Sequence, residues 1–201
     1  MINMNKYIIF IVVLLLIVIG YYLIKKNQVE KKSLSQDYNK VSSEGNLKII
    51  ESKISYSVDK VFLSKPMEKI TGTTNDISGI LNYAQNKISA DLIVPTLNIK
   101  TGNDKRDEDV RKILGEEIKI EVKEREFILP LENKIPILIT VGGQTNEVMF
   151  DVIAKDEENI ITFAGKSILL MKLFGIEPPS MLEVYKVSDE VELSFELKAE
   201  K

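Results

Sequence analysis

The sequence predicts an all-β domain with one short α-helix, preceded by a membrane anchor. Apolar and polar residues alternate with a period of two along most of the chain after residue 47, as they do in strands that bury one face. After Gly102 the spacing of apolar residues becomes helical. Near the start of the chain, residues 7–24 form an uninterrupted apolar run without a charge.

The apolar run at residues 7–24 predicts an uncleaved transmembrane helix. At about 1.5 Å per residue it just spans a hydrocarbon core of roughly 30 Å. The bulky residues 20–24 offer no small-residue pattern that a signal peptidase would cut. We therefore expect four parts, with boundaries at 1–6 for a cytoplasmic N-terminus, 7–24 for the anchor, 25–46 for a polar tether and 47–201 for one folded domain.

Four strands are expected before the helix. Residues 48–58 alternate with Ile54 and Tyr56 on the inner face, and weaker alternation covers residues 61–71 and 77–83. A fourth strand begins at Ile88, with Ala90, Leu92 and Val94 on the same side. Turn-forming residues separate the predicted strands, here at 75–76 and 85–86 and later at 132–133, 142–143 and 156–159.

Residues 104–114 have the spacing and the end signals of a helix. Asn103 or Asp104 can cap its first amides, and Gly115 suits the left-handed position that ends a helix. The apolar positions predict a buried stripe formed by Val110, Ile113 and Leu114. By spacing alone, we expect the charged positions to form a solvated face that only tunes local stability, namely Arg106, Asp107 and Arg111.

Five further strands follow the helix, which gives about nine in total. Residues 117–123 place Ile118, Ile120 and Val122 inward, and weaker alternation covers 135–141, 148–154 and 160–165. The clearest pattern is at residues 190–198, where Val191, Leu193, Phe195 and Leu197 share one face. Short connections make neighbouring strands antiparallel, and a barrel and a sandwich both fit this number of strands.

Composition excludes several classes of function. The net charge is −3 and both signs are interspersed, so no basic patch is available for nucleic acid. The chain has neither histidine nor cysteine, which removes the common nucleophile systems and the ordinary zinc ligands. We expect no catalytic residue, no metal site, no cofactor and no nucleic-acid partner.

Several short motifs occur in an order that resembles a known family. They include residues 55–59, the corner from Thr101-Gly102 through Lys105-Arg106-Asp107 to Arg111, and the segment 174–180. Together they resemble the YceI-like family of bacterial envelope proteins over roughly residues 52–197. The resemblance implies an eight-stranded antiparallel, lipocalin-like barrel that holds a polyisoprenoid lipid. The chain departs from the family where many members carry a histidine, here residues 65–68, and an arginine, here residues 169–171.

The resemblance and the residue pattern conflict over the side of the membrane on which the domain lies. Four lysines follow the apolar run and only Lys6 precedes it, so the positive-inside rule would keep the domain in the cytoplasm. Family members are exported, and long domains can cross a membrane despite such a bias. We therefore expect a single-pass protein of the cell membrane with its barrel on the extracytoplasmic side.

Residues 174–182 place apolar side chains in a loop that Pro178 and Pro179 stiffen, which predicts either a rim at the barrel mouth or a plug. Together with the inner strand faces, they define the expected ligand wall: Ile54, Tyr56, Ile118, Ile120, Val122, Val148, Phe150, Phe174, Ile176, Val191, Leu193 and Phe195. The expected function is non-catalytic binding or transport of a polyisoprenoid or similar long-chain lipid at the membrane surface. The alternative is a structural or stress-related envelope module whose barrel is filled by its own side chains and which acts through protein contacts.

Overall fold

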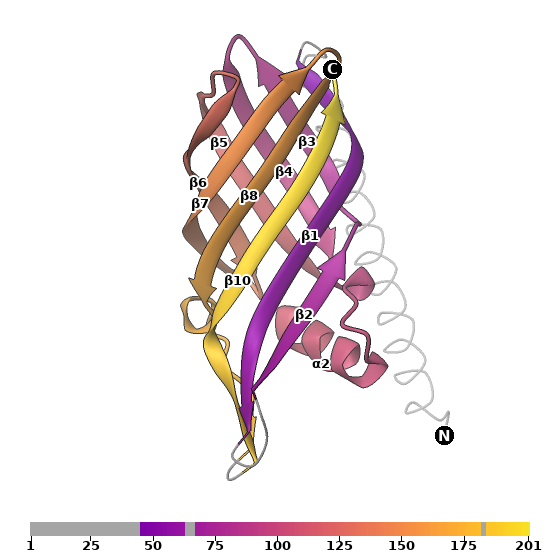
Figure 1. Ribbon diagram of the computed structural model, residues 1–201, viewed down its shortest axis with the longest axis vertical. Coiled ribbons are helices and arrows are strands. Elements are labelled where there is room, and N and C mark those ends of the chain that lie inside the picture. The colour runs from indigo at the N-terminus through magenta and orange to yellow at the C-terminus, as the bar shows by residue number, and fades with distance from the viewer. Residues whose placement is uncertain (1–44, 63–66, 182–183) are drawn as a thin grey trace, which may run out of the picture. The chain divides into compact units, whose positions relative to one another are not determined.

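A computed structural model of the protein describes residues 45–62, 67–181 and 184–201, and it shows one antiparallel barrel (Figure 1). The predicted anchor at residues 7–24, and the predicted tether as far as residue 44, lie outside the described residues. Among the residues that are described, no helix has the length and apolarity needed to cross a membrane.

Eight strands form the ring, in the order β1, β3, β4, β5, β6, β7, β8 and β10, and β1 pairs with β10 to close it. Two short strands, β2 and β9, extend the sheet at one end. The strands are β1 Asn46–Phe62, β2 Glu68–Thr74, β3 Ser78–Ala84, β4 Lys87–Pro95, β5 Glu117–Glu126, β6 Leu131–Val141, β7 Gln144–Glu157, β8 Ile160–Leu170, β9 Ser180–Met181 and β10 Tyr185–Glu200. The predicted eight-stranded antiparallel barrel is therefore confirmed.

Strand β1 has three different partners along its length. Its first residues, Asn46 and Leu47, pair with β3, its lower half pairs with β2, and β10 runs beside it from Lys48 to Phe62. The prediction of a separate strand over residues 61–71 is wrong, because Val61 and Phe62 end β1, whereas residues 68–71 belong to β2. Alternation alone does not reveal this reversal, since a hairpin in register preserves the period of two.

The lower ends of β1 and β10, together with β2 and β9, extend past the ring of eight strands (Figure 1). We call this extension the tongue and define it as residues 58–62, 67–70, 180–181 and 184–187. Val58, Ile70 and Val187 of the tongue form a small apolar cluster with Val191, which follows the tongue along β10. The tongue is therefore a packed continuation of the sheet.

Strand β6 begins earlier than its sequence suggests. The predicted turn at residues 132–133 is wrong, because both residues lie in β6 and pair with β7. The chain reverses instead between Glu126 and Leu131. Glu132 and Asn133 are exposed, and the Asn133 side chain accepts a hydrogen bond from the amide of Lys134. Turn-forming polar residues are tolerated there because both side chains are exposed near the start of the strand, although consecutive residues point to opposite faces.

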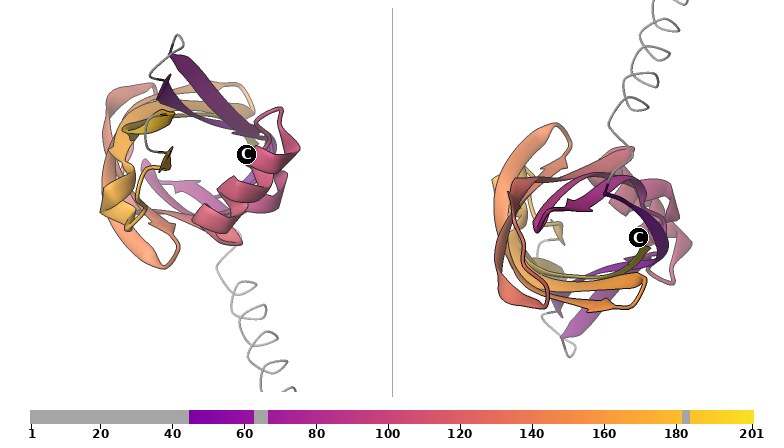
Figure 2. Two further views of the ribbon diagram at one scale, coloured as in Figure 1. Left: turned by 90° about the horizontal axis from the view of Figure 1, so that it is seen from below. Right: turned by 90° about the horizontal axis from the view of Figure 1, so that it is seen from above.

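Helix α2 spans Asp104–Leu114, as predicted. The Asn103 side chain accepts a hydrogen bond from the amide of Arg106 at 3.0 Å, and Gly115 ends the helix at a φ of 83°. Figure 2 shows α2 against the rim at one end of the barrel. The described residues also include the short 3-10 helices η2 Thr96–Asn98, before α2, and η3 Met171–Phe174, after β8.

The expected buried stripe of α2 is corrected by the structure. Val110 and Leu114 are half-buried and Ile113 is 39% exposed, because this face borders a cavity, and Leu114 also packs against the core. The buried residue of the helix is Asp107, at 3% exposure, so the expectation of a solvated face is wrong at this position.

Asp107 fixes α2 to the preceding turn. Its Oδ1 accepts hydrogen bonds from the Thr101 hydroxyl at 2.6 Å and from the Thr101 amide at 2.8 Å, and Lys100 Nζ lies 3.8 Å from Oδ2. The hydroxyl bond contributes most to holding the pKa of Asp107 below its usual value. These contacts compensate for burying the carboxylate, so the helix is held at a fixed place on the barrel rim.

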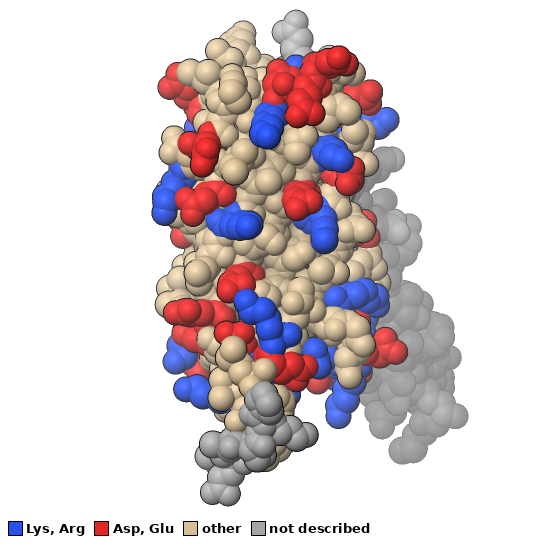
Figure 3. All heavy atoms as spheres, in the orientation of Figure 1, with Lys and Arg blue, Asp and Glu red and all other residues tan. Residues whose placement is uncertain are grey.

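Charged side chains of both signs are interspersed over the barrel face shown in Figure 3. The ion pair of Lys198 with Glu51 at 2.7 Å joins neighbouring strands, and the pair of Lys69 with Glu192 at 2.8 Å spans β1, which lies between β2 and β10. These side chains are largely exposed, so such pairs contribute little to stability.

Candidate functional site

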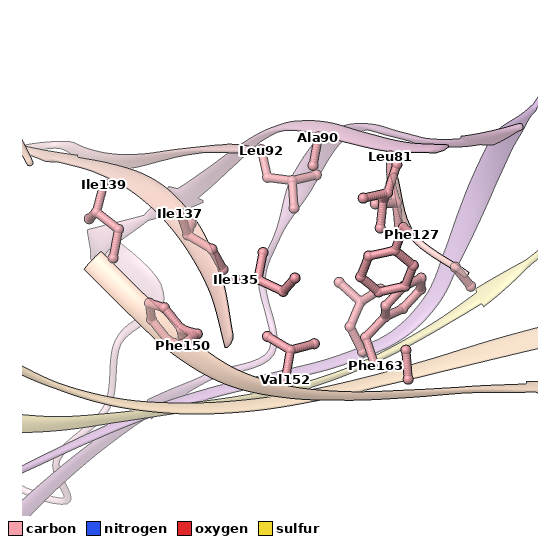
Figure 4. Packing of buried hydrophobic residues seen from close by; sticks show 14 of the residues in the cluster. Leu81, Ala90, Leu92, Phe127, Ile135, Ile137, Ile139, Phe150, Val152 and Phe163 are labelled. Carbon is pink, nitrogen blue, oxygen red and sulfur yellow. The ribbon is translucent and has the colours of Figure 1, made fainter. Parts of the chain in front are cut away.

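The barrel encloses a cavity of about 500 Å³ whose walls are mostly apolar. The inner faces of β4 and β6 contribute Ile88, Ala90, Leu92 and Val94, and Ile135, Ile137 and Ile139. Figure 4 shows several of these side chains pointing inward, together with Phe150 and Val152 of β7, the strand that pairs with β6. The alternating pattern of each strand thus becomes a continuous apolar lining.

One end of the cavity is closed by aromatic rings. Phe127 is 2% exposed and lies edge-on to Tyr83, with centroids 6.4 Å apart, and 6.0 Å from the ring of Phe163 (Figure 4). The Phe127 amide donates to the carbonyl of Asn86 at 2.7 Å, which ties the β5–β6 connection to the β3–β4 turn. The cavity therefore ends at these rings.

The opposite end lies beneath α2 and carries most of the charge on the lining, contributed by Lys60, Lys105, Arg106 and Asp109. Arg106 Nη2 lies 3.6 Å from Glu68 Oε1, and Lys60 Nζ lies 3.9 Å from the ring centroid of Tyr185. Glu196 on β10 also borders the cavity, but it is exposed and lies between the inward-facing Phe195 and Leu197. The cavity is thus apolar along its depth and polar at this mouth.

Two aromatic side chains of the wall rest on glycines of the neighbouring strand. The ring of Phe195 covers its cross-strand partner Gly165, and the ring of Tyr56 covers Gly72. Phe195 also packs against Phe150, with centroids 5.7 Å apart. Because neither glycine has a side chain, the rings lie close to the sheet and leave space in the centre.

The hydroxyl of Tyr56 is buried, and no described atom forms a hydrogen bond with it. Burial raises the pKa of Tyr56 to about 12, and the nearby Asp107 carboxylate adds to this shift while Arg106 opposes it. The phenol is therefore neutral over the physiological range.

The structure places nearly all of the predicted wall residues on this cavity. Those that line it are Ile54, Tyr56, Ile118, Ile120, Val122, Phe150, Phe174, Ile176, Val191, Leu193 and Phe195. Val148 does not line it and is buried in the surrounding core. Alternation indicates the side of the strand on which a residue lies, but not whether neighbours cover it. Contact of these residues with a ligand stays a prediction.

The sequence of residues 174–182 suggested either a plug or a rim at the barrel mouth, and the segment has both cavity-lining and exposed apolar residues. Phe174 is buried and Ile176 half-buried, and both line the cavity, whereas Met181 is 55% exposed. Leu182 lies outside the described residues. Asn146 Nδ2 donates to the carbonyl of Leu173 at 2.8 Å, which fixes η3 against β7.

Sequence reasoning missed Phe127, which closes the cavity. It follows four charged residues, 123–126, and belongs to no alternating segment. A single aromatic residue directly after a charged strand end was the one available signal.

A family model for the YceI-like domain matches residues 46–199. No curated protein matches the chain. Among solved structures, a polyisoprenoid-binding domain from Saccharophagus degradans is 13% identical with a TM-score of 0.60, covering 77% of this chain and 97% of that one. BcnA from Burkholderia cenocepacia is 17% identical with a TM-score of 0.57, covering 74% and 96%. The Campylobacter jejuni YceI protein is 16% identical with a TM-score of 0.57, covering 68% and 88%. At these identities the solved structures show a shared fold.

Proposed function

The chain belongs to the YceI-like family, and on this basis we propose that its barrel binds a polyisoprenoid or similar long-chain lipid without catalysing a reaction. The observation that carries the proposal is the deep apolar cavity, closed by Phe127 and open beneath α2. The description of the Saccharophagus degradans domain as polyisoprenoid-binding supports it.

Binding would be driven by removing the lipid chain from water. Each buried methylene contributes about 0.8 kcal/mol, so affinity grows with the length of chain that the cavity accepts. The rings at the closed end limit that length, and the charged residues at the mouth favour a polar head group at that end. The site would therefore select chain length more strongly than head-group chemistry.

A barrel filled by its own side chains, the structural alternative, would leave no enclosed space. The cavity of about 500 Å³ lies within the range of small-molecule sites and favours the carrier.

We also propose that residues 7–24 anchor the chain in the cell membrane and that the barrel lies on the extracytoplasmic side, where it exchanges lipid with the bilayer. Protease added to cells stripped of outer barriers should then digest the domain. If the domain is protected while a known exterior protein is cut, the domain lies in the cytoplasm, as the positive-inside rule predicts.

Lipid binding is tested by native mass spectrometry of the full chain, purified in detergent from a lipid-containing host. Ala90→Phe puts a ring into the cavity and should abolish a long-chain adduct. Ile153→Phe is the control, because it adds the same ring at an outer position that is 46% exposed, and this variant should keep the adduct. Thermal melts of both variants establish that they are folded. If the natural sequence carries no apolar adduct even when long-chain isoprenoids are supplied, the carrier function is wrong.

A further inference from the structure

The tongue exposes large apolar side chains around and beyond the cavity mouth. Val61 is 51% exposed, Met67 61%, Met181 55% and Val184 46%. Val61 lies in β1 and Met181 in β9, whereas Met67 directly precedes β2 and Val184 directly precedes β10. These segments lie together because Phe62 pairs with Tyr185 and Tyr185 with Met181. The tip of the tongue is therefore an apolar surface formed by four separate segments.

The inner face of the tongue is continuous with the cavity wall. Lys60, Tyr185 and Val187 all belong to the lining. The rings of Phe62 and Tyr185 lie 6.3 Å apart, and Lys60 Nζ is 4.9 Å from the first and 3.9 Å from the second. A chain leaving the cavity along this face would meet aromatic and aliphatic surface before it met water.

These residue types suit the boundary between lipid head groups and acyl chains. Aliphatic side chains at a tip gain by leaving water, tyrosine rings prefer the interface, and lysines keep their charge in the head-group layer while their stems lie in apolar surroundings. Lys186 lies opposite Val61, and Lys69 follows Glu68 at the start of β2. Since charges of both signs occur there, the attraction would come mainly from apolar burial.

We propose that the tip of the tongue inserts into the head-group layer of a lipid bilayer, so that its inner face bridges the bilayer and the cavity mouth. This inference rests on the proposed lipid-binding function, and it adds the surface through which the lipid enters and leaves. The occupant of the apolar tip is the bilayer, because at the tip the exposed apolar residues meet the inner face of the tongue, which continues into the cavity proposed to take a lipid chain.

The absence of tryptophan from the sequence allows a direct test. Val61→Trp places a single reporter on the tongue, and Ile128→Trp places one at a 53% exposed position at the closed end of the barrel. Each full-length variant is reconstituted into phosphatidylcholine vesicles with brominated acyl chains. Insertion to a depth of roughly 5–10 Å should quench about half of the emission at position 61 and little of it at position 128.

Two results would overturn the insertion. Equal quenching at the two positions would mean that the chain is held near the bilayer without a preferred end. If the emission wavelength of the tryptophan at position 61 shifts with protein concentration but its emission is not quenched, the tip packs against a second copy of the chain.

A second variant separates this inference from the proposed function. Val61→Asp combined with Met181→Asp alters only exposed side chains, so loading with an isoprenoid in detergent should be unchanged. Transfer of the same lipid from phosphatidylcholine vesicles should slow by about tenfold or more, since two apolar contacts with the bilayer are lost. Normal loading with unchanged transfer refutes insertion of the tongue but not lipid binding. A natural sequence that never loads refutes lipid binding itself.

Discussion

Replacing Gly165 by alanine is expected to move the ring of Phe195 into the cavity. A Cβ atom built on Gly165 lies 2.3 Å from Cε1 and 2.6 Å from Cζ of Phe195. Carbon atoms in good contact are about 3.5–4.0 Å apart, so the ring must move by about 1.2–1.7 Å. Gly165 is not among the residues with positive φ, so alanine meets no backbone strain there.

The cost of this substitution follows from what lies on each side of the ring. Overpacking a filled core costs about 1–3 kcal/mol. Here the side of the ring away from the sheet faces the cavity, so we expect the lower end of that range, about 1 kcal/mol, measured by chemical denaturation. The volume that the ring enters is lost to the ligand, and native mass spectra should show shorter chains retained.

The double variant Gly165→Ala with Phe195→Leu provides the control. Leucine lacks the Cε1 and Cζ atoms that collide with the new methyl group, so the two substitutions should cost about 1 kcal/mol less together than the sum of their separate effects. If the cost of Gly165→Ala persists in full beside Leu, or if the retained chain lengths do not change, the ring is not displaced into a ligand site.

Three further outcomes are expected. Phe127→Ala should cost about 3–5 kcal/mol in the free energy of unfolding and let longer chains bind, because it removes the ring that closes the cavity; an unchanged chain-length distribution would mean that the closed end does not limit the ligand. Asp107→Asn should cost about 1–2 kcal/mol at pH 7 in denaturant titrations, because it weakens the charge-assisted bonds from Thr101. Since the folded-state pKa of Asp107 is lowered, the contribution of Asp107 to the free energy of unfolding is complete above about pH 4 and is lost as the pH falls through the lowered value. The variant should lack this acid-dependent loss. Equal slopes of the free energy of unfolding against pH in both proteins would contradict this role of Asp107. Leu114→Ala should cost about 1–2 kcal/mol because its side chain is half-buried against the cavity, whereas Lys112→Ala, on the exposed face, should leave the melt unchanged; equal losses would mean that α2 does not pack through Leu114.

The parts of the fold that depend on local chemistry could be predicted from the sequence. The bounds of α2 follow from a cap at Asn103 and a stop at Gly115, because both signals act within one turn of the helix. The inward face of β10 follows from strict alternation between Val191 and Leu197. Each of these patterns is complete within about ten residues of sequence.

Features that depend on residues distant in sequence could not be predicted. Asp107 is buried because α2 docks against the turn at Thr101, and its spacing alone resembles that of exposed ion-pairing residues. Phe127 closes the cavity only because the β5–β6 connection meets Tyr83 and Phe163. The reversal between Phe62 and Glu68 leaves the alternating period intact, so the tongue was hidden within one predicted strand.

The pairing of β1 with β10 determines when during synthesis the domain can fold. Lys48 lies opposite Glu200, so the first strand of the ring to leave the ribosome cannot pair with β10 until that last strand has been synthesised. Pairings so distant in sequence form slowly, because a long loop must close before any contact compensates for the lost chain entropy. The barrel is therefore completed after translation has passed β10, and a ribosome that stalls earlier leaves an open sheet with two unpaired edges, a form prone to aggregate.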